Sequence, residues 1–188
     1  TYGGTPDRVQ NNANEHLRVD SNIWVLSARV GVPTFRDRFL SLLNVNTLTW
    51  TARVPWPSKY NQTLTVWDRV GSSVFSFSAT AVERIDVTTR AITSTPWSPP
   101  GAPLTCAAYD TKIAVFFGSA VPNFVIYDTI TGTFTTHAIP GANWRLAKMG
   151  FRGVWVTSFG SPAHVAFVDM VNPGGAVQSK TQSNWGPT

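Results

Sequence analysis

The sequence has a single cysteine, Cys106, among its 188 residues. One cysteine can form neither a disulfide bond within the chain nor a metal site built from several thiolates. Cys106 lies in the apolar stretch Leu104–Ala108, which is typical of a small buried side chain. The sequence therefore excludes an internal disulfide and a cysteine-based metal centre.

Charged residues are also scarce, at 13% of the chain, about half the usual share. The 15 basic and 10 acidic residues give a net charge of +5, but no run of Lys or Arg occurs. A dispersed charge of this size attracts acidic partners only weakly. We therefore expect no nucleic-acid site.

No apolar run reaches the length of a transmembrane helix, and no signal-peptide pattern is present. The chain starts at Thr1, and both of its Met residues are internal, so we expect a processed product or part of a longer chain. Its polar surface, rich in Ser, Thr and Asn, favours an extracellular or virion setting, although the compartment stays open. Aromatic residues make up 12%, which indicates a packed core and not disorder.

What the sequence does contain is an internal repeat. Four segments share an apolar residue, then Asn or Asp, a turn and a Thr-rich run. The Asn or Asp residues, here called the turn anchors, are Asn44, Asp86, Asp128 and Asp169, at steps of 42, 42 and 41 residues. Such a side chain at the first position of a turn can bond the backbone two residues on. A register kept over three intervals indicates four copies of one structural unit.

Each unit reads as four short strands separated by turn residues, and helical periodicity is absent. The second strand of each unit has consecutive apolar residues, as in Ile113–Phe116 and Val154–Val156, which predicts burial on both faces. Four-stranded units can achieve this if they stack as the blades of a β-propeller. The predicted organisation is one all-β propeller domain with a polar N-terminal arm at 1–16 and blades at 17–58, 59–100, 101–141 and 142–188.

The unit resembles the kelch-like β-propeller repeat. The first copy carries this resemblance in Ile23–Leu26, in Asn46-Thr-Leu-Thr-Trp50 and in Val54-Pro-Trp-Pro57. The third copy, Tyr127-Asp-Thr-Ile-Thr-Gly-Thr-Phe134, is also similar to streptogramin-lyase-type repeats. The resemblance implies a propeller of four visible blades, which either close alone or form part of a larger ring.

In the propellers that this chain resembles, the loops from strand two to three and from strand four to one line a common face. Here those loops hold aromatic and basic residues, of kinds enriched in binding hot spots. The candidate binding residues are Arg29, Phe35, Arg36, Arg38, Trp56, Tyr60, Trp97, Trp144, Arg145 and His164. The Trp residues have the alternative role of packing between blades.

No catalytic constellation is evident. The three His residues occupy different repeat positions. Turn roles account for most of the ten acids, because Asp20, Asp68 and Asp110 lie near the first turns of their units and three anchors are Asp, so we expect no metal and no cofactor. The favoured function is a non-enzymatic module that binds a protein or a subunit of an assembly. The alternatives are a carbohydrate- or receptor-binding surface protein and a propeller-type lyase or hydrolase built around His164.

Overall fold

The computed structural model describes residues 8–9, 17–19, 22–28, 38–55, 64–67, 73–86, 88–118, 123–139, 144–158, 163–172 and 177–182. These residues form seventeen β strands, numbered β1 to β17 in chain order. Their structure is all-β, as the sequence predicted. Within this part of the chain, no helix is long and apolar enough to cross a membrane.

The strands form four antiparallel sheets. The first sheet contains β1 (Arg8–Val9), β2 (Leu17–Val19), β3 (Asn22–Ala28), β4 (Arg38–Asn44) and β5 (Thr49–Pro55). The second contains β6 (Thr65–Trp67), β7 (Ser73–Phe77), β8 (Ala81–Asp86) and β9 (Ile92–Pro96). The third contains β10 (Pro103–Tyr109), β11 (Lys112–Phe117), β12 (Asn123–Asp128) and β13 (Phe134–Ala138). The fourth contains β14 (Trp144–Gly150), β15 (Gly153–Ser158), β16 (Ala163–Asp169) and β17 (Val177–Gln182).

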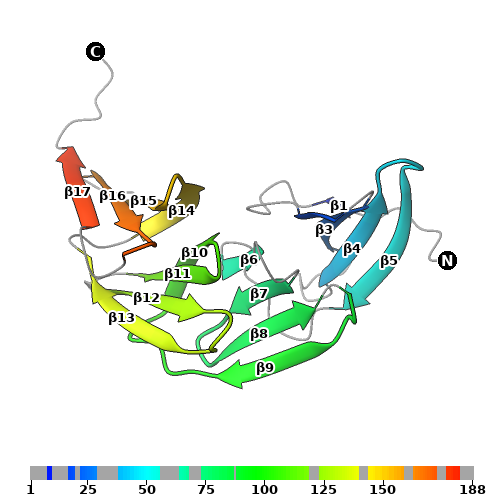
Figure 1. The fold of residues 1–188 in the computed structure, drawn as a ribbon, viewed down its shortest axis with the longest axis horizontal. Coiled ribbons are helices and arrows are strands. Elements are labelled where there is room, and N and C mark those ends of the chain that lie inside the picture. Colours follow the sequence, from blue (N-terminus) through cyan, green and yellow to red (C-terminus); the bar gives the residue numbers. More distant parts are fainter. Residues whose placement is uncertain are drawn as a thin grey trace, which may run out of the picture.

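Each of the last three sheets is a meander in which consecutive strands are neighbours. In the first sheet, β3, β4 and β5 follow the same order, and both β1 and β2 pair with β3. The four sheets follow one another along an arc, with the first and fourth at its two ends (Figure 1). The first strands lie on the inside of this arc, where β10 contacts β6 and β14. The protein is a β-propeller of four visible blades, and the described sheets form an open arc and not a closed ring.

The second strands explain why the sheets stack. All five residues of β7 are buried, and so are the last five residues of β11, Ile113–Phe117. Because alternate side chains of a strand point to opposite faces, such strands must be covered on both sides. Burial on both faces, predicted from consecutive apolar residues, is therefore confirmed for these two strands. It is wrong for Val154–Val156 of β15, where Trp155 is exposed because no described sheet covers that face.

Two separate cores lie between neighbouring sheets. The core between the second and third sheets contains Phe75, Phe77 and Tyr127, whose rings meet edge to face at 5.7–5.9 Å between centroids. Cys106 is fully buried in this core, as its apolar neighbours predicted. The core between the third and fourth sheets is centred on small and aliphatic residues such as Ala114 and Val156. The third sheet is thus packed on both of its faces.

A direct hydrogen bond also links the third and fourth sheets. The hydroxyl of Thr105 in β10 accepts a bond from the backbone N–H of Ala147 in β14, 3.1 Å away. Both strands carry an irregularity in their pairing at the same place, between Pro103 and Thr105 and between Trp144 and Leu146. Each of the two first strands thus has an irregularity of pairing beside this hydrogen bond. The bond itself is buried and joins the third and fourth sheets.

Candidate protein-interaction face

Most of the predicted loop-face residues cannot be placed. Arg29, Phe35, Arg36, Trp56 and Tyr60 lie outside the described residues. Arg38 begins β4, and only its backbone is described. Their role in binding therefore stays a prediction.

Two of the predicted binding residues, Trp97 and Trp144, are core residues. Trp97 follows β9 and stacks on Phe134 at 5.2 Å between ring centroids, while its indole N–H donates to the carbonyl of Ser78 at 2.8 Å. Trp144 is fully buried between the third and fourth sheets, and its indole nitrogen has no hydrogen-bond partner among the described residues. Both rings pack between blades, which was the alternative role considered for them.

The structure brings Trp144, Arg145 and His164 together at one end of the fourth sheet. Trp144 pairs with Ser158, and the hydroxyl of Ser158 accepts a bond from the backbone N–H of His164 at 2.9 Å. The His164 and Trp144 rings lie 6.3 Å apart, and Arg145 is exposed in the bulge beside them. Trp97 lies apart from this group, between the second and third sheets.

The opposite side of the molecule is formed by hairpin turns, and the four anchors build the turns between third and fourth strands. In each, the side-chain Oδ1 accepts bonds from the backbone N–H groups two and three residues ahead, at 2.7–3.2 Å. The first turn uses Asn44 and the other three use Asp86, Asp128 and Asp169. The amide oxygen and the carboxylate oxygen thus perform the same task.

Three of these turns share a further backbone feature. The residue four positions after the anchor has a positive φ, 53° for Leu48, 62° for Arg90 and 69° for Gly132. In the second and third turns, the N–H of this residue donates to the anchor carbonyl at 2.8–2.9 Å. Only glycine adopts this conformation without a steric cost. Leu48 and Arg90 are therefore held in it by the surrounding turn.

Within the third and fourth sheets, the two turns at this end are bonded to each other. The backbone N–H of Thr129 donates to the carbonyl of Thr111 at 2.8 Å, and Met170 donates in the same way to Arg152 at 3.0 Å. The backbone N–H groups thus fix the 3–4 turn against the 1–2 turn. In the fourth sheet, the bond holds the carbonyl of Arg152, the residue next to Phe151.

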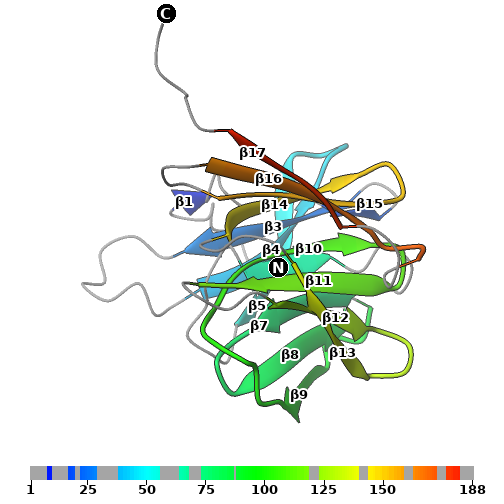
Figure 2. The ribbon, with the colours of Figure 1, turned by 90° about the vertical axis from the view of Figure 1, so that its left-hand side faces the viewer.

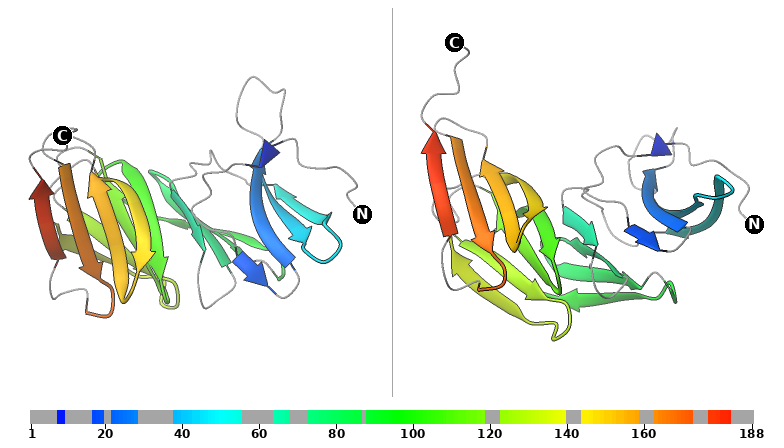
Figure 3. Two further views of the ribbon diagram at one scale, coloured as in Figure 1. Left: turned by 90° about the horizontal axis from the view of Figure 1, so that it is seen from above. Right: turned by 45° about the horizontal axis from the view of Figure 1, so that its top comes forward.

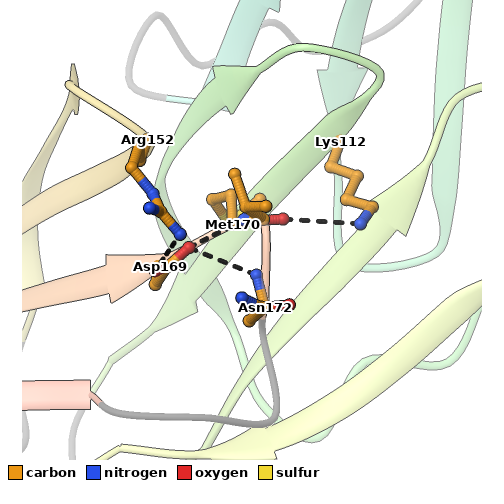
Figure 4. A network of polar contacts seen from close by, with 6 residues as sticks. Lys112, Arg152, Asp169, Met170 and Asn172 are labelled. Atoms are coloured by element: carbon orange, nitrogen blue, oxygen red, sulfur yellow. Dashed lines mark hydrogen bonds and ion pairs between the residues drawn. The ribbon is translucent and has the colours of Figure 1, made fainter.

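A polar network then joins the turns of neighbouring blades (Figure 4). The ammonium group of Lys112, at the start of β11, donates to the carbonyl of Met170 at 3.4 Å. The guanidinium of Arg152 lies 3.4 Å from Oδ2 of Asp169. The ion pair is exposed and contributes little free energy of its own, but it positions Arg152 above the turn.

Exposed apolar side chains stand at the tips of these turns. They are Leu48, Ile130, Phe151 and Val171, which are 75%, 71%, 88% and 49% exposed. We call this surface, together with the exposed Arg90 and Arg152, the hairpin face. The turns of the third and fourth sheets project on one side of the molecule (Figure 2). Turns normally carry polar residues, so apolar residues at four tips mark a surface of interest.

Charge on this side is mixed. Hydrogen bonds from backbone N–H groups lower the pKa of Asp86, Asp128 and Asp169, so that all three are ionised at neutral pH. One oxygen of each carboxylate accepts hydrogen bonds from two backbone N–H groups of its own turn. The guanidinium of Arg90 is exposed and that of Arg152 is paired with Asp169, so charges of both signs lie near the tips.

The hairpin face is not among the predicted binding residues, although the sequence contains a signal for it. The anchors predict turns, and the predicted binding residues all lie in the other loops. An apolar residue inside such a turn, as Ile130 in Asp128-Thr-Ile-Thr-Gly132, has no local reason to be there. The Phe151–Arg152 turn shows the same mismatch.

Among the described residues, no three His, Cys, Asp or Glu side chains gather into a possible metal site. Burial lowers the pKa of His137, whose ring stacks on Phe124 at 5.3 Å and keeps Nε2 inside the protein. The neutral, buried ring is consistent with a packing role.

No protein-family model matches the sequence, and neither does any curated protein sequence. Solved structures do match in fold. The match to U3-55K covers 80% of this chain and 44% of the U3-55K chain, with 8% sequence identity and a TM-score of 0.56. The match to BamB from Moraxella catarrhalis covers 76% of this chain and 39% of the BamB chain, with 14% sequence identity and a TM-score of 0.53. The match to a luciferin-regenerating enzyme covers 77% of this chain and 53% of the enzyme chain, with 16% sequence identity and a TM-score of 0.52.

These identities are low, so the likeness concerns the fold alone. BamB and U3-55K are β-propellers, in agreement with the four antiparallel sheets described above, of which the second, third and fourth are stacked. The chain spans only about two fifths to one half of the solved structures it matches.

Proposed function

We propose that this chain is a non-enzymatic, protein-binding part of a β-propeller, and that it binds through the hairpin face. The observation that carries the proposal is the set of four exposed apolar tips, of which Leu48, Ile130 and Val171 lie on turns that anchor side chains hold in place. A partner that covers these tips removes apolar surface from water, which favours association.

The rigidity of the turns supports the same proposal. A flexible loop loses conformational entropy when it binds, whereas a preformed surface loses less. Here the anchor side chains bond the backbone of each turn, and in the third and fourth sheets the 1–2 and 3–4 turns are bonded to each other.

The loop face predicted from the sequence is the second candidate surface, since its exposed member Arg145 follows Trp144, whose ring lies 6.3 Å from that of His164. The kelch-like relationship is part of the same proposal. The 42-residue step and the turn anchors support it, whereas the Gly-Gly pair of that family is replaced by residues such as Ser27–Ala28.

Affinity capture from an extract of the organism that encodes the chain tests both surfaces. The first bait carries Ile130→Ser, Phe151→Ser and Val171→Ser on the hairpin face. The second carries Arg36→Glu and Arg38→Glu in the predicted loop face. Thr93→Ser, an exposed position in β9, is the control.

We expect the wild type and the control to capture the same partner protein and the first bait to lose it. Loss only with the second bait would transfer the site to the loop face. Equal capture by all baits would contradict both sites. Binding to a glycan array, without a protein partner, would favour the carbohydrate alternative.

A further inference from the structure

The outer strand of the second sheet, β9, has a free edge. β9 pairs with β8 along one side, and no described strand pairs with its other side. It lies on the convex rim of the arc, as the green strand at the lower margin of the second sheet (Figure 1; Figure 3, right). All five residues of this strand, Ile92–Pro96, are exposed, so no element buries either of its faces.

The pairing of β8 with β9 fixes which backbone groups face outward. Bonded and non-bonded residue pairs alternate along an antiparallel ladder. At one end of this ladder, the N–H of Asp86 donates to the carbonyl of Ala91 at 3.0 Å. At the other end, the N–H of Trp97 donates to the carbonyl of Thr80 at 3.1 Å. The register between the two bonds is unbroken, so both ends give the same alternation.

Within β9, this alternation directs the backbone groups of Thr93 and Thr95 toward β8 and those of Ile92 and Ser94 away from it. Ile92 and Ser94 thus form a row of two N–H donors and two carbonyl acceptors along the free edge. Pro96 also occupies an outward position, and its lack of an N–H group ends the row. An extended chain repeats its donors and acceptors every two residues as this edge does, whereas a helix uses its backbone groups internally.

β9 lacks the features that usually protect an edge strand from the addition of another strand. Such strands commonly carry charged residues, above all Lys. Among the other outer strands, β5 contains Arg53 and β17 contains Lys180. β13 has no Lys, Arg, Asp or Glu, but the rings of Phe134 and His137 stack on neighbouring rings. Of the four described outer strands, only β9 combines an uncharged sequence with exposure of all its residues.

The side chains of the second sheet indicate what an added strand would contain. One row across the sheet runs from Val74 through Ile85, both fully buried, to Ile92, which is 38% exposed. An apolar residue beside Ile92 on an added strand would extend this row and cover its exposed end. On the other face, Thr93 and Thr95 favour neighbours of the same β-branched, polar kind. The matching segment therefore alternates aliphatic β-branched residues with Thr.

We propose that the free edge of β9 binds an extended segment of a partner protein as an added antiparallel strand, with a Val or Ile of that segment beside Ile92. The site is separate from the hairpin face and does not depend on the function proposed for that face. A second copy of β9 fits less well. If two β9 strands pair through both outward residues, Ile92 lies beside Ser94 and the apolar row stays uncovered.

Two isomeric peptides test the backbone pairing. Both have the sequence Thr-Val-Thr-Val-Thr-Val-Lys and a fluorescein label, and they carry N-methyl groups either on the Thr or on the Val residues. Residues opposite Ile92 and Ser94 exchange hydrogen bonds with them, so the Val amides must keep their N–H groups. Fluorescence anisotropy should show binding of the Thr-methylated peptide and binding at least about 10-fold weaker for the Val-methylated one, as expected for lost backbone hydrogen bonds.

Variants of the protein locate the edge. Ser94→Pro removes an outward N–H and leaves the ladder with β8 intact, so it should weaken binding of the Thr-methylated peptide by about 10-fold. Ile92→Lys adds a protective charge without changing the backbone and should weaken binding similarly. Thr136→Pro, at the equivalent outward position of β13, is the matched control and should leave binding unchanged. Far-UV circular dichroism checks that each variant keeps its sheet structure.

Amide hydrogen exchange provides a second readout. In the free protein, Thr93 and Thr95 should exchange more slowly than Ile92 and Ser94, because only the first two are bonded to β8. The bound peptide should slow exchange at Ile92 and Ser94. The proposal is overturned if neither peptide binds, if the Val-methylated peptide binds as well as its isomer, or if Thr136→Pro weakens binding as much as Ser94→Pro. A wild-type dimer that Ser94→Pro separates in sedimentation velocity would replace the partner segment by a second copy and overturn it too.

Discussion

Exchanging residues at the fourth position after the anchor should change stability in opposite directions in two otherwise similar turns. Arg90 and Gly132 both have a positive φ, at 62° and 69°, and both donate to the anchor carbonyl. An L-residue in this conformation costs about 1–2 kcal/mol. Replacing Arg90 by glycine relieves this cost. Glycine also makes the unfolded chain more flexible, which lowers stability by about 0.4–1 kcal/mol and offsets part of the relief. We therefore expect Arg90→Gly to stabilise the protein by about 0.5–1 kcal/mol.

Gly132→Ala should destabilise it by a similar amount. A Cβ at Gly132 would meet only the hydroxyl of Tyr127, at 4.0 Å, which is an ordinary contact. The effect therefore comes from the backbone conformation and not from a clash. Ser94→Gly, at an exposed position in β9, is the control, and it should destabilise the protein because its strand conformation gains nothing from glycine.

The assay is urea unfolding followed by tryptophan fluorescence, with the free energy of unfolding compared at an unchanged slope. The reasoning is refuted if Arg90→Gly destabilises the protein as much as Ser94→Gly does, or if Gly132→Ala has no effect. Leu48→Gly offers an independent repeat in the first sheet, where φ is 53°.

Two further predictions concern single hydrogen-bonding side chains. Thr105→Val removes the acceptor for the buried N–H of Ala147, so hydrogen exchange of the Ala147 amide should accelerate. Thr105→Ser keeps a hydroxyl acceptor and should preserve the protection of this amide. Equal protection in both variants would count against the bond. The lowered pKa of Asp128 means that its ionised form stabilises the fold fully above the unfolded value near 3.8, and that this stability is lost as the pH falls through the lower folded value. Asp128→Asn should keep the turn, as Asn44 does, change stability by about 0.5 kcal/mol or less at pH 7, and weaken the loss of stability between pH 5 and pH 2.5 in urea titrations.

The local sequence determined the strands and their turns. Asn and Asp form their turns through bonds to residues two and three positions ahead, so their pattern is visible without any tertiary contact. Consecutive apolar residues in β7 and β11 likewise required cover on both faces, which predicted stacked sheets. These features depend on short stretches of chain. The turn anchors recur in all four units, which made the repeat visible in the sequence.

Tertiary structure decided which side chains are exposed. Trp97 and Trp144 occupy linker positions that the sequence could assign to a surface or to a core, and packing between sheets buries both. Trp155 has the opposite outcome, because it lies on the outer face of the last sheet of the arc. Burial on a sheet face depends on the neighbouring sheet, which the sequence of one strand does not specify.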